Sequence, residues 1–408
     1  MAAGHAARAR RDVASVVNLL GRALDLVPSG PRRPGLLVRL GEGLHLAGES
    51  ARARSVLEEA ASLAAAAGDG HVEWLARIHL ATIRLDSEPE GAAGWALSEG
   101  EAAVATREAA GDHEVVARAW DLIAEAHNLR GQISEWRAAS ERALAHARRT
   151  GDLAVEVPIV THSAGPIVYG SVTVEEGLSY ADEILARLGH VPEVQGFAQH
   201  VRAHMLARRG ESAGAFEAVS AWRSHKRELG QEAAYAQTAS CAWDVCSWAE
   251  EWGRGEEVLR EAYEILERMD QKAYLSTVAA HLGEAVFRSG RLDEAERLSE
   301  VSERLGASDD RYNEAAWRRL RAKVLAARGD LARAEAVARR AVEVAADVGF
   351  LDDAALAWLD LAEILRAADR PEAREAAAEA VALFERKGNL VGAGWARSLL
   401  GGHASGPA

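Results

Sequence analysis

The chain of 408 residues has few aromatic side chains, few cysteines and no excess of positive charge. Aromatic residues make up only 5% of it, whereas Ala, Leu, Arg and Glu, which favour helices, are abundant. Two cysteines, Cys241 and Cys246, cannot build a disulfide framework, so we expect a reducing, cytoplasmic compartment. The formal charge of −14 argues against a nucleic-acid partner, because such surfaces need clustered Lys and Arg.

Long apolar runs and the two nucleotide-binding motifs are missing as well. No stretch has the ~18 consecutive apolar residues of a membrane span, and the first residues lack the apolar centre of a signal peptide, so we expect no membrane partner. Neither the phosphate loop G-x-x-x-x-G-K-[ST] nor the dinucleotide fingerprint G-x-G-x-x-G occurs. We therefore predict no catalytic residue, no cofactor and no bound metal.

What the sequence does contain is a repeat of about 40 residues. Four stretches (39–60, 201–222, 281–302 and 321–341) combine an apolar helical pattern with a Gly and, five residues later, an Ala. The glycines are Gly48, Gly210, Gly290 and Gly329, and the alanines are Ala53, Ala215, Ala295 and Ala334. Gly can end the first helix of a hairpin in the left-handed conformation, and the small residues allow the second helix to approach closely. Weaker copies centre on Gly131 and Gly253.

The spacing of these centres predicts an all-α protein of about nine helical hairpins. A single hairpin cannot bury its own apolar face, so we expect the hairpins to stack into one solenoid over residues 1–400. Residues 401–408 are small and polar and are expected to form a disordered tail. In Gly-Asp turns such as 64–71, 107–114 and 148–155, Gly ends one helix and Asp is placed to cap the next.

The pattern L-G-x-x-L-x-x-x-G-x-x-x-x-A, which begins at Leu40, resembles the tetratricopeptide repeat. This resemblance implies a right-handed α–α superhelix that binds a protein or a peptide segment. Within that superfamily the chain resembles the C-terminal repeats of bacterial regulators that carry an N-terminal nucleotide cyclase or a STAND/AAA-type ATPase. The stretches concerned are 12–28, 274–298, 320–330 and 356–371. The resemblance implies a non-catalytic module of a signalling or transcriptional regulator.

The N-terminal end looks like half a hairpin. Residues 12–27 fit a second helix with Val13, Val16, Val17, Leu20 and Leu24 on one face, and only about five residues before it, 6–10, remain for a partner helix. Either an upstream cyclase or ATPase domain docks at 12–27, or the chain starts with a short frayed helix.

In tetratricopeptide superhelices the first helix of each hairpin lines the concave face. Aligning each repeat on its turn glycine therefore predicts a binding groove of mixed charge with a few aromatic side chains, as peptide or domain docking requires. Its candidate residues are Arg118, Asp121, Glu125, Asn128, Phe197, His200, His204, Trp243, Ser247, Glu284, Arg319 and Lys323.

Residues 157–174 depart most from the repeat. The segment carries no formal charge and contains Pro158 and Pro166, so we expect a buried first helix with a kink. The alternative is a change of curvature that opens an apolar pocket near His162 and Tyr169.

Several acidic and histidine pairs allow more than one interpretation. Asp309–Asp310 and Asp352–Asp353 precede helices and are expected to cap them, although acidic pairs also bind metals. His200 and His204 lie four residues apart and could share a metal ion, but without an evident third ligand we predict two solvent-facing histidines. Cys241 and Cys246 are predicted to be buried. Two alternatives to the scaffold stay open: a small-molecule-sensing solenoid, and a helical enzyme that uses His162, His204 or Asp309 and Asp310 in an internal cavity.

Overall fold

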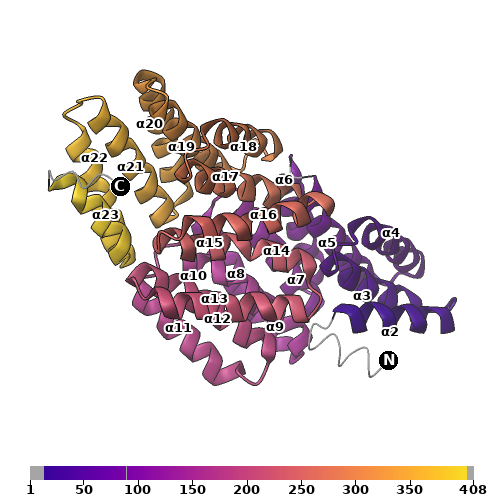
Figure 1. Cartoon of the computed structure of the whole chain (residues 1–408). Coiled ribbons are helices and arrows are strands. Elements are labelled where there is room, and N and C mark those ends of the chain that lie inside the picture. The colour runs from indigo at the N-terminus through magenta and orange to yellow at the C-terminus, as the bar shows by residue number, and fades with distance from the viewer. Residues whose placement is uncertain (1–12, 89, 402–408) are drawn as a thin grey trace.

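The computed structural model describes residues 13–88 and 90–401, and all regular structure in these ranges is α-helical. The chain forms the predicted right-handed α–α superhelix of the tetratricopeptide type (Figure 1). Residues 6–10, the expected partner helix, and most of the expected tail, 402–408, lie outside the described residues. No helix in the described part of the chain has both the length and the apolar character that a membrane span needs.

Nine antiparallel hairpins follow α2 (Val13–Leu26) within the described ranges, and α23 (Leu390–Leu400) comes last, which confirms the predicted number. The first five pair α3 (Arg33–Leu46) with α4 (Ser50–Ala67), α5 (Gly70–Ser87) with α6 (Ala92–Arg107), α7 (His113–Leu129) with α8 (Ile133–Thr150), α9 (Leu153–His162) and α10 (Ala164–Tyr169) with α11 (Val174–Leu188), and α12 (Pro192–Arg209) with α13 (Ser212–Glu228). The other four pair α14 (Glu232–Gln237) and α15 (Ala239–Trp248) with α16 (Trp252–Arg268), α17 (Lys272–Arg288) with α18 (Leu292–Leu305), α19 (Arg311–Ala327) with α20 (Leu331–Val348), and α21 (Leu351–Ala367) with α22 (Ala373–Lys387).

The turn residues behave as the repeat pattern predicts, with one exception. All four strong turn glycines have a left-handed backbone, with φ between 76° and 85°, and the four matching alanines are 0% exposed. In the sixth hairpin, however, the left-handed residue is Glu250 (φ 58°), and Gly253 lies inside α16. The centre assigned to this weak copy was therefore wrong by three residues along the chain.

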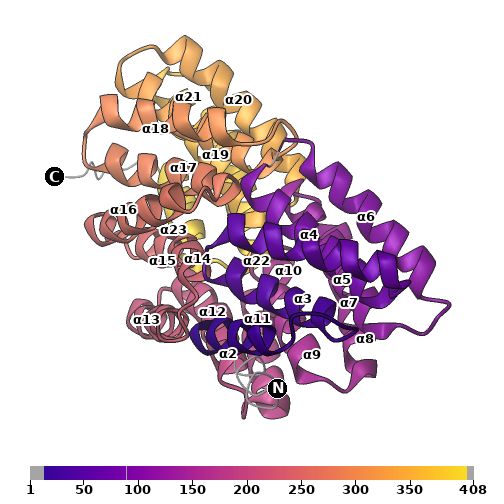
Figure 2. The ribbon, with the colours of Figure 1, turned by 90° about the vertical axis from the view of Figure 1, so that its right-hand side faces the viewer.

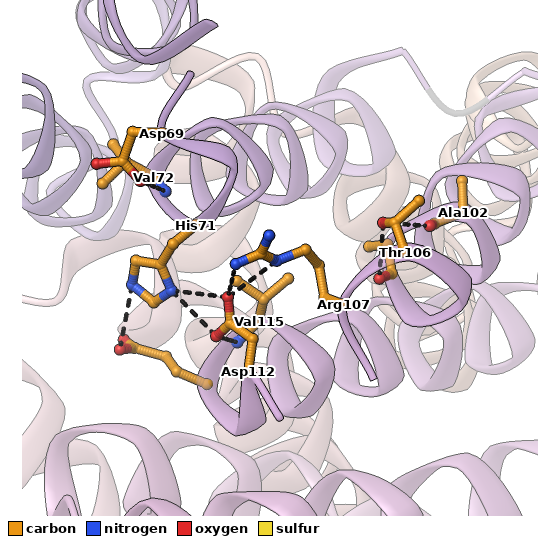
Figure 3. Close-up of polar contacts among 10 residues, drawn as sticks. Asp69, His71, Val72, Ala102, Thr106, Arg107, Asp112 and Val115 are labelled. Carbon is orange, nitrogen blue, oxygen red and sulfur yellow. Dashed lines mark hydrogen bonds and ion pairs between the residues drawn. The ribbon is translucent and has the colours of Figure 1, made fainter. Parts of the chain in front are cut away.

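Aspartates cap the helices that follow the Gly-Asp turns, as expected. The Asp69 carboxylate accepts a hydrogen bond from the Val72 amide, and Asp112 accepts one from the Val115 amide (Figure 3). Asp152 does the same for α9. The Asp112 carboxylate also accepts hydrogen bonds from Arg107 and lies 3.0 Å from a ring nitrogen of His71, so it connects α5, α6 and α7.

Two first helices are broken. The break that the prolines of 157–174 predict is present, because Ser163 separates α9 from α10. The sixth hairpin has a second break that no proline marks, at Thr238 between α14 and α15. The Thr238 hydroxyl donates to the Tyr235 carbonyl oxygen, which competes with the helical hydrogen-bond pattern at this point.

The superhelix curves so tightly that hairpins far apart in the sequence touch. The yellow C-terminal helices α22 and α23 lie next to the magenta helices α10 to α12 (Figures 1 and 2), and α5 contacts α17. The Lys387 ammonium, at the end of α22, donates hydrogen bonds of 2.8 Å to the carbonyl oxygens of Gly170 and Val172. Arg130 pairs with Asp309 at 3.1 Å. These contacts turn the expected concave groove into a partly enclosed space.

Candidate functional site

A cavity of about 400 Å³ lies inside the superhelix. Its wall is built mainly by the first helices of the hairpins, namely α3, α5, α7, α9, α10, α12, α14, α15, α17 and α19. The volume falls in the range of pockets that hold small ligands. The side of each hairpin expected to face a ligand therefore does face this cavity.

The structure places eight of the candidate residues on the cavity wall. They come from three consecutive hairpins of the repeat, the third to the fifth, and are polar, charged or aromatic. They are Arg118, Asp121, Glu125, Asn128, His162, Tyr169, Phe197 and His200. The two residues of the alternative pocket, His162 and Tyr169, thus share one cavity with the groove residues of α7 and α12.

The remaining six candidates lie elsewhere. His204 is 0% exposed and sits behind the wall, with its ring 5.1 Å from that of His200. Trp243 packs on the His281 ring, and the Ser247 hydroxyl donates to the Asp244 carbonyl oxygen.

The last three candidate residues, Glu284, Arg319 and Lys323, belong to a separate ion-pair cluster on α17, α19 and α21. Lys323 pairs with Glu284, and Arg319 pairs with Asp360 at 2.7 Å. Alignment on the turn glycines does not show that α17 packs on α19 here and that α19 packs on α21. These three side chains therefore form ion pairs within the protein and do not face the cavity.

Several cavity residues were missed by sequence reasoning. Glu42 and His45 on α3 and Asp86 on α5 lie on the wall, as do Tyr274 and Tyr312 from the far side of the superhelix. The first three occupy the same side of a first helix as the candidates in later hairpins, so the same alignment would have found them. The two tyrosines reach the cavity because of the closure, which the repeat pattern does not encode.

The cavity wall has a surplus of negative charge. Its two permanent cations are already matched, because Arg118 lies 3.5 Å from Glu42 and Lys226 pairs with Glu193. The Asp86 carboxylate lies 3.2 Å from His45, and the Asp121 carboxylate lies 3.0 Å from His162.

Glu125 is a buried acid of this wall. Burial raises the pKa of its carboxyl, and the neighbouring Asp121 and Asp86 carboxylates raise it further. It forms a hydrogen bond with Tyr274, and burial raises the pKa of this phenol well above its usual value. A positive charge placed beside Glu125 would relieve both the repulsion and the burial penalty.

Aromatic rings complete the wall next to these acids. Tyr169 stacks on Phe350 with centroids 5.4 Å apart, and Tyr312 lies at the same distance from Phe350. Trp136 and Trp222 also face the cavity. Aromatic faces together with carboxylates are a suitable environment for a cation.

The two histidines of α12 are not solvent-facing, and that prediction was wrong. His204 is fully buried, and His200 stacks on Trp222 with centroids 4.1 Å apart. Burial lowers the pKa of both rings well below the usual value, which leaves them neutral. The predicted burial of Cys241 and Cys246 is confirmed, and Cys241 lies close to the two histidines.

The aspartate pairs divide between capping and other roles. Asp310 caps α19 by accepting a hydrogen bond from the Asn313 amide, whereas Asp309 binds Arg130. Asp352 lies in the first turn of α21 but does not cap it. Its carboxylate instead accepts a hydrogen bond from the buried Arg208, so the predicted cap was wrong here.

No family model and no curated protein matches the chain. Among solved structures, the chain is similar to the crystal structure of a Rap protein complexed with Competence and Sporulation Factor. The identity is 12%, the TM-score is 0.52, and the match covers 83% of this chain and 99% of that one. A second similar structure is the APC/C hetero-tetramer Cut9–Hcn1, with 12% identity, a TM-score of 0.41 and coverage of 98% and 95%. The likeness to Rap agrees with a tetratricopeptide-type fold.

Proposed function

We propose that this chain is a non-catalytic binding module, the regulatory part of a bacterial cytoplasmic signalling protein, and that its central cavity takes a positively charged organic group. That group is an amine or guanidinium, carried either by a free small molecule or by a short segment of a partner protein. The observation that carries the proposal is the cavity itself, about 400 Å³ in volume, where the carboxylates of Asp86, Asp121 and Glu125 lie beside aromatic rings.

Electrostatics supports a cation in this place. The Asp121 and Asp86 carboxylates lie close enough to Glu125 to raise its pKa, and a bound cation would favour the charged form of Glu125. A charge-assisted hydrogen bond contributes about 1.5–3 kcal/mol, which is roughly a 10- to 100-fold gain in affinity. Rings such as Tyr169 and Tyr274 add cation–π attraction when water is excluded.

The similar Rap protein was solved with a factor bound, which is consistent with a binding role for this architecture. Catalysis receives less support. The sequence G-x-S-x-G at 210–214, typical of hydrolase nucleophiles, covers the turn after α12 and the first residues of α13, and it does not follow a strand. The alternative acids Asp309 and Asp310 serve an ion pair and a helix cap.

Docking of an upstream cyclase or ATPase domain on residues 12–27 belongs to the same proposal. Val16 and Leu20 of α2 are buried, and Leu26 at its end is 83% exposed. A pull-down by the full-length chain and by a variant that lacks residues 1–30 tests this docking. Equal recovery of the candidate domain by both would contradict it.

Calorimetric titration of the purified chain tests the cavity. We expect spermidine or a short Arg- and Lys-containing peptide to bind, and an acidic peptide of equal length not to bind; the first two probes distinguish the free from the peptide-borne cation. Glu125→Gln should weaken binding by about 10- to 100-fold. Affinity for the wild type should also rise with pH as Glu125 ionises, and the variant should lose this dependence.

The matched control is Glu114→Gln, on the same helix but outside the cavity wall. It should bind like the wild type. Equal affinity of Glu125→Gln and the wild type, or binding of neither cation, would refute the proposed role of the cavity.

A further inference from the structure

Two histidines and one cysteine meet at the edge of the cavity in an arrangement that the proposed function does not use. His200 and His204 lie one turn apart on α12, so both rings project from the same side of that helix. α15 packs against α12 and brings Cys241 to them. One ring nitrogen of each histidine and the Cys241 sulfur all lie within 4.8 Å of one another.

His204 shows that this cluster is incomplete without a further partner. Its side chain is 0% exposed, its Nδ1 atom lies next to the Asp244 carboxylate, and its Nε2 atom forms no hydrogen bond in the described part of the chain. Buried polar atoms in folded proteins are nearly always paired, so an unpaired Nε2 in the interior needs an explanation. A metal ion bound at Nε2 would give this nitrogen a partner.

The Asp244 carboxylate lies next to the His204 ring, as carboxylates often do beside metal-bound histidines. The Nδ1 atom of His204 lies 3.1 Å from Oδ2 of Asp244, which leaves Nε2 for the cluster. Such a carboxylate fixes the ring orientation and raises the basicity of the ligating nitrogen.

A metal ion can reach the cluster from the cavity, and the nearby Arg208 is paired with a carboxylate. His200 and Cys241 line the cavity, so an ion can reach them from that side. The positive charge of the nearby Arg208 is opposed by Asp352, with which it pairs, and by Asp244. Arg208 therefore does not act on the cluster as an unpaired cation.

We propose that His200, His204 and Cys241 bind one Zn²⁺ ion, with a fourth position open to the cavity for water or a ligand atom. Two imidazole nitrogens and one thiolate match the preference of zinc, whereas Mg²⁺ and Ca²⁺ need oxygen ligands. Binding releases the thiol proton of Cys241 to solvent, since the thiolate is the ligand. This inference is independent of the proposed cation site on α7.

Titration of the chelator-treated full chain with Co²⁺, followed by Zn²⁺, tests the site. We expect a thiolate-to-cobalt charge-transfer band that saturates at one Co²⁺ per chain and disappears on addition of one equivalent of Zn²⁺. Cys241→Ser changes only one atom and should abolish the band. Asp244→Asn should retain the band with about 10- to 100-fold weaker affinity.

Cys246→Ser is the matched control, because Cys246 is equally buried on the same helix but lies outside the cluster. It should titrate like the wild type. If circular dichroism shows that Cys241→Ser is unfolded, His200→Ala is used in its place, because His200 is less buried than His204 and Cys241. A wild type without a saturable band, or a band that survives in Cys241→Ser or His200→Ala, would overturn the proposal.

Discussion

Replacing Arg208 with methionine should destabilise the chain more than any change at a surface arginine. The Arg208 side chain is 2% exposed, and its Nε donates a 2.6 Å hydrogen bond to Oδ2 of Asp352, 144 residues further along. The other carboxylate oxygen accepts a hydrogen bond from the Asn389 amide group. The pair therefore joins α12, α21 and the start of α23 across the closed superhelix.

The size of the effect follows from the burial of this pair. Removal of one partner from a buried ion pair costs roughly 3–5 kcal/mol, because the other charge stays in the interior without compensation. Methionine fills the space of the arginine stem, so the loss of packing adds little. In the double variant Arg208→Met/Asp352→Asn no charge is stranded, and its destabilisation should fall short of the sum of the single changes by at least ~1 kcal/mol.

Urea unfolding followed by circular dichroism measures these free energies. The control is the adjacent Arg209→Met, because Arg209 pairs with Glu175 and Glu211 on the surface, where such pairs contribute about 0–1 kcal/mol. If Arg208→Met and Arg209→Met unfold within ~0.5 kcal/mol of each other, the pair does not hold the superhelix closed.

Two further predictions concern a turn and a buried acid. Gly131→Ala should destabilise the fold by more than the ~1–2 kcal/mol that a left-handed alanine costs, because the new Cβ would lie 2.9 Å from Val348. The control is Gly111→Ala, whose Cβ would meet no atom within 4 Å and which should show the backbone effect alone. Equal losses of stability in urea unfolding would contradict the contact with Val348. Burial raises the pKa of Asp310 to about 7, above the ~3.9 of the unfolded chain, so the folded state holds its proton more tightly and loses stability as the pH rises from ~4 to ~7. Asp310→Asn removes this titration but keeps a capping oxygen, so its stability relative to the wild type should increase between pH 5 and pH 8, and a pH-independent difference would refute the argument.

The repeat pattern was sufficient to predict the local architecture. Gly48 and Gly290 end first helices with a left-handed backbone, and Asp69 and Asp112 cap the next helices, as their positions indicate. Such features depend on residues a few positions apart, which a sequence shows directly. The break at Thr238 was missed. Prolines mark the other break in the sequence, whereas a threonine whose hydroxyl binds a helical carbonyl oxygen looks like any other threonine.

Closure of the superhelix could not be predicted in the same way. It depends on pairs such as Arg208–Asp352 and on Lys387, whose partners lie more than 140 residues away. A repeat pattern fixes how neighbouring hairpins stack but leaves undetermined the small rotation per hairpin that accumulates into curvature. For that reason the groove became a cavity, and His204, expected at the surface, became an interior residue.

The same closure connects stability with binding. Arg208 lies one turn after His204 on α12, and its partner Asp352 belongs to α21, so the wall that presents His200 to the cavity is held by a contact with the C-terminal hairpins. A ligand or ion that binds the closed form better than an opened form must, by linkage, strengthen the closure by the same free energy. Arg208→Met should therefore weaken cation binding in the cavity, although Arg208 is not part of the cavity wall.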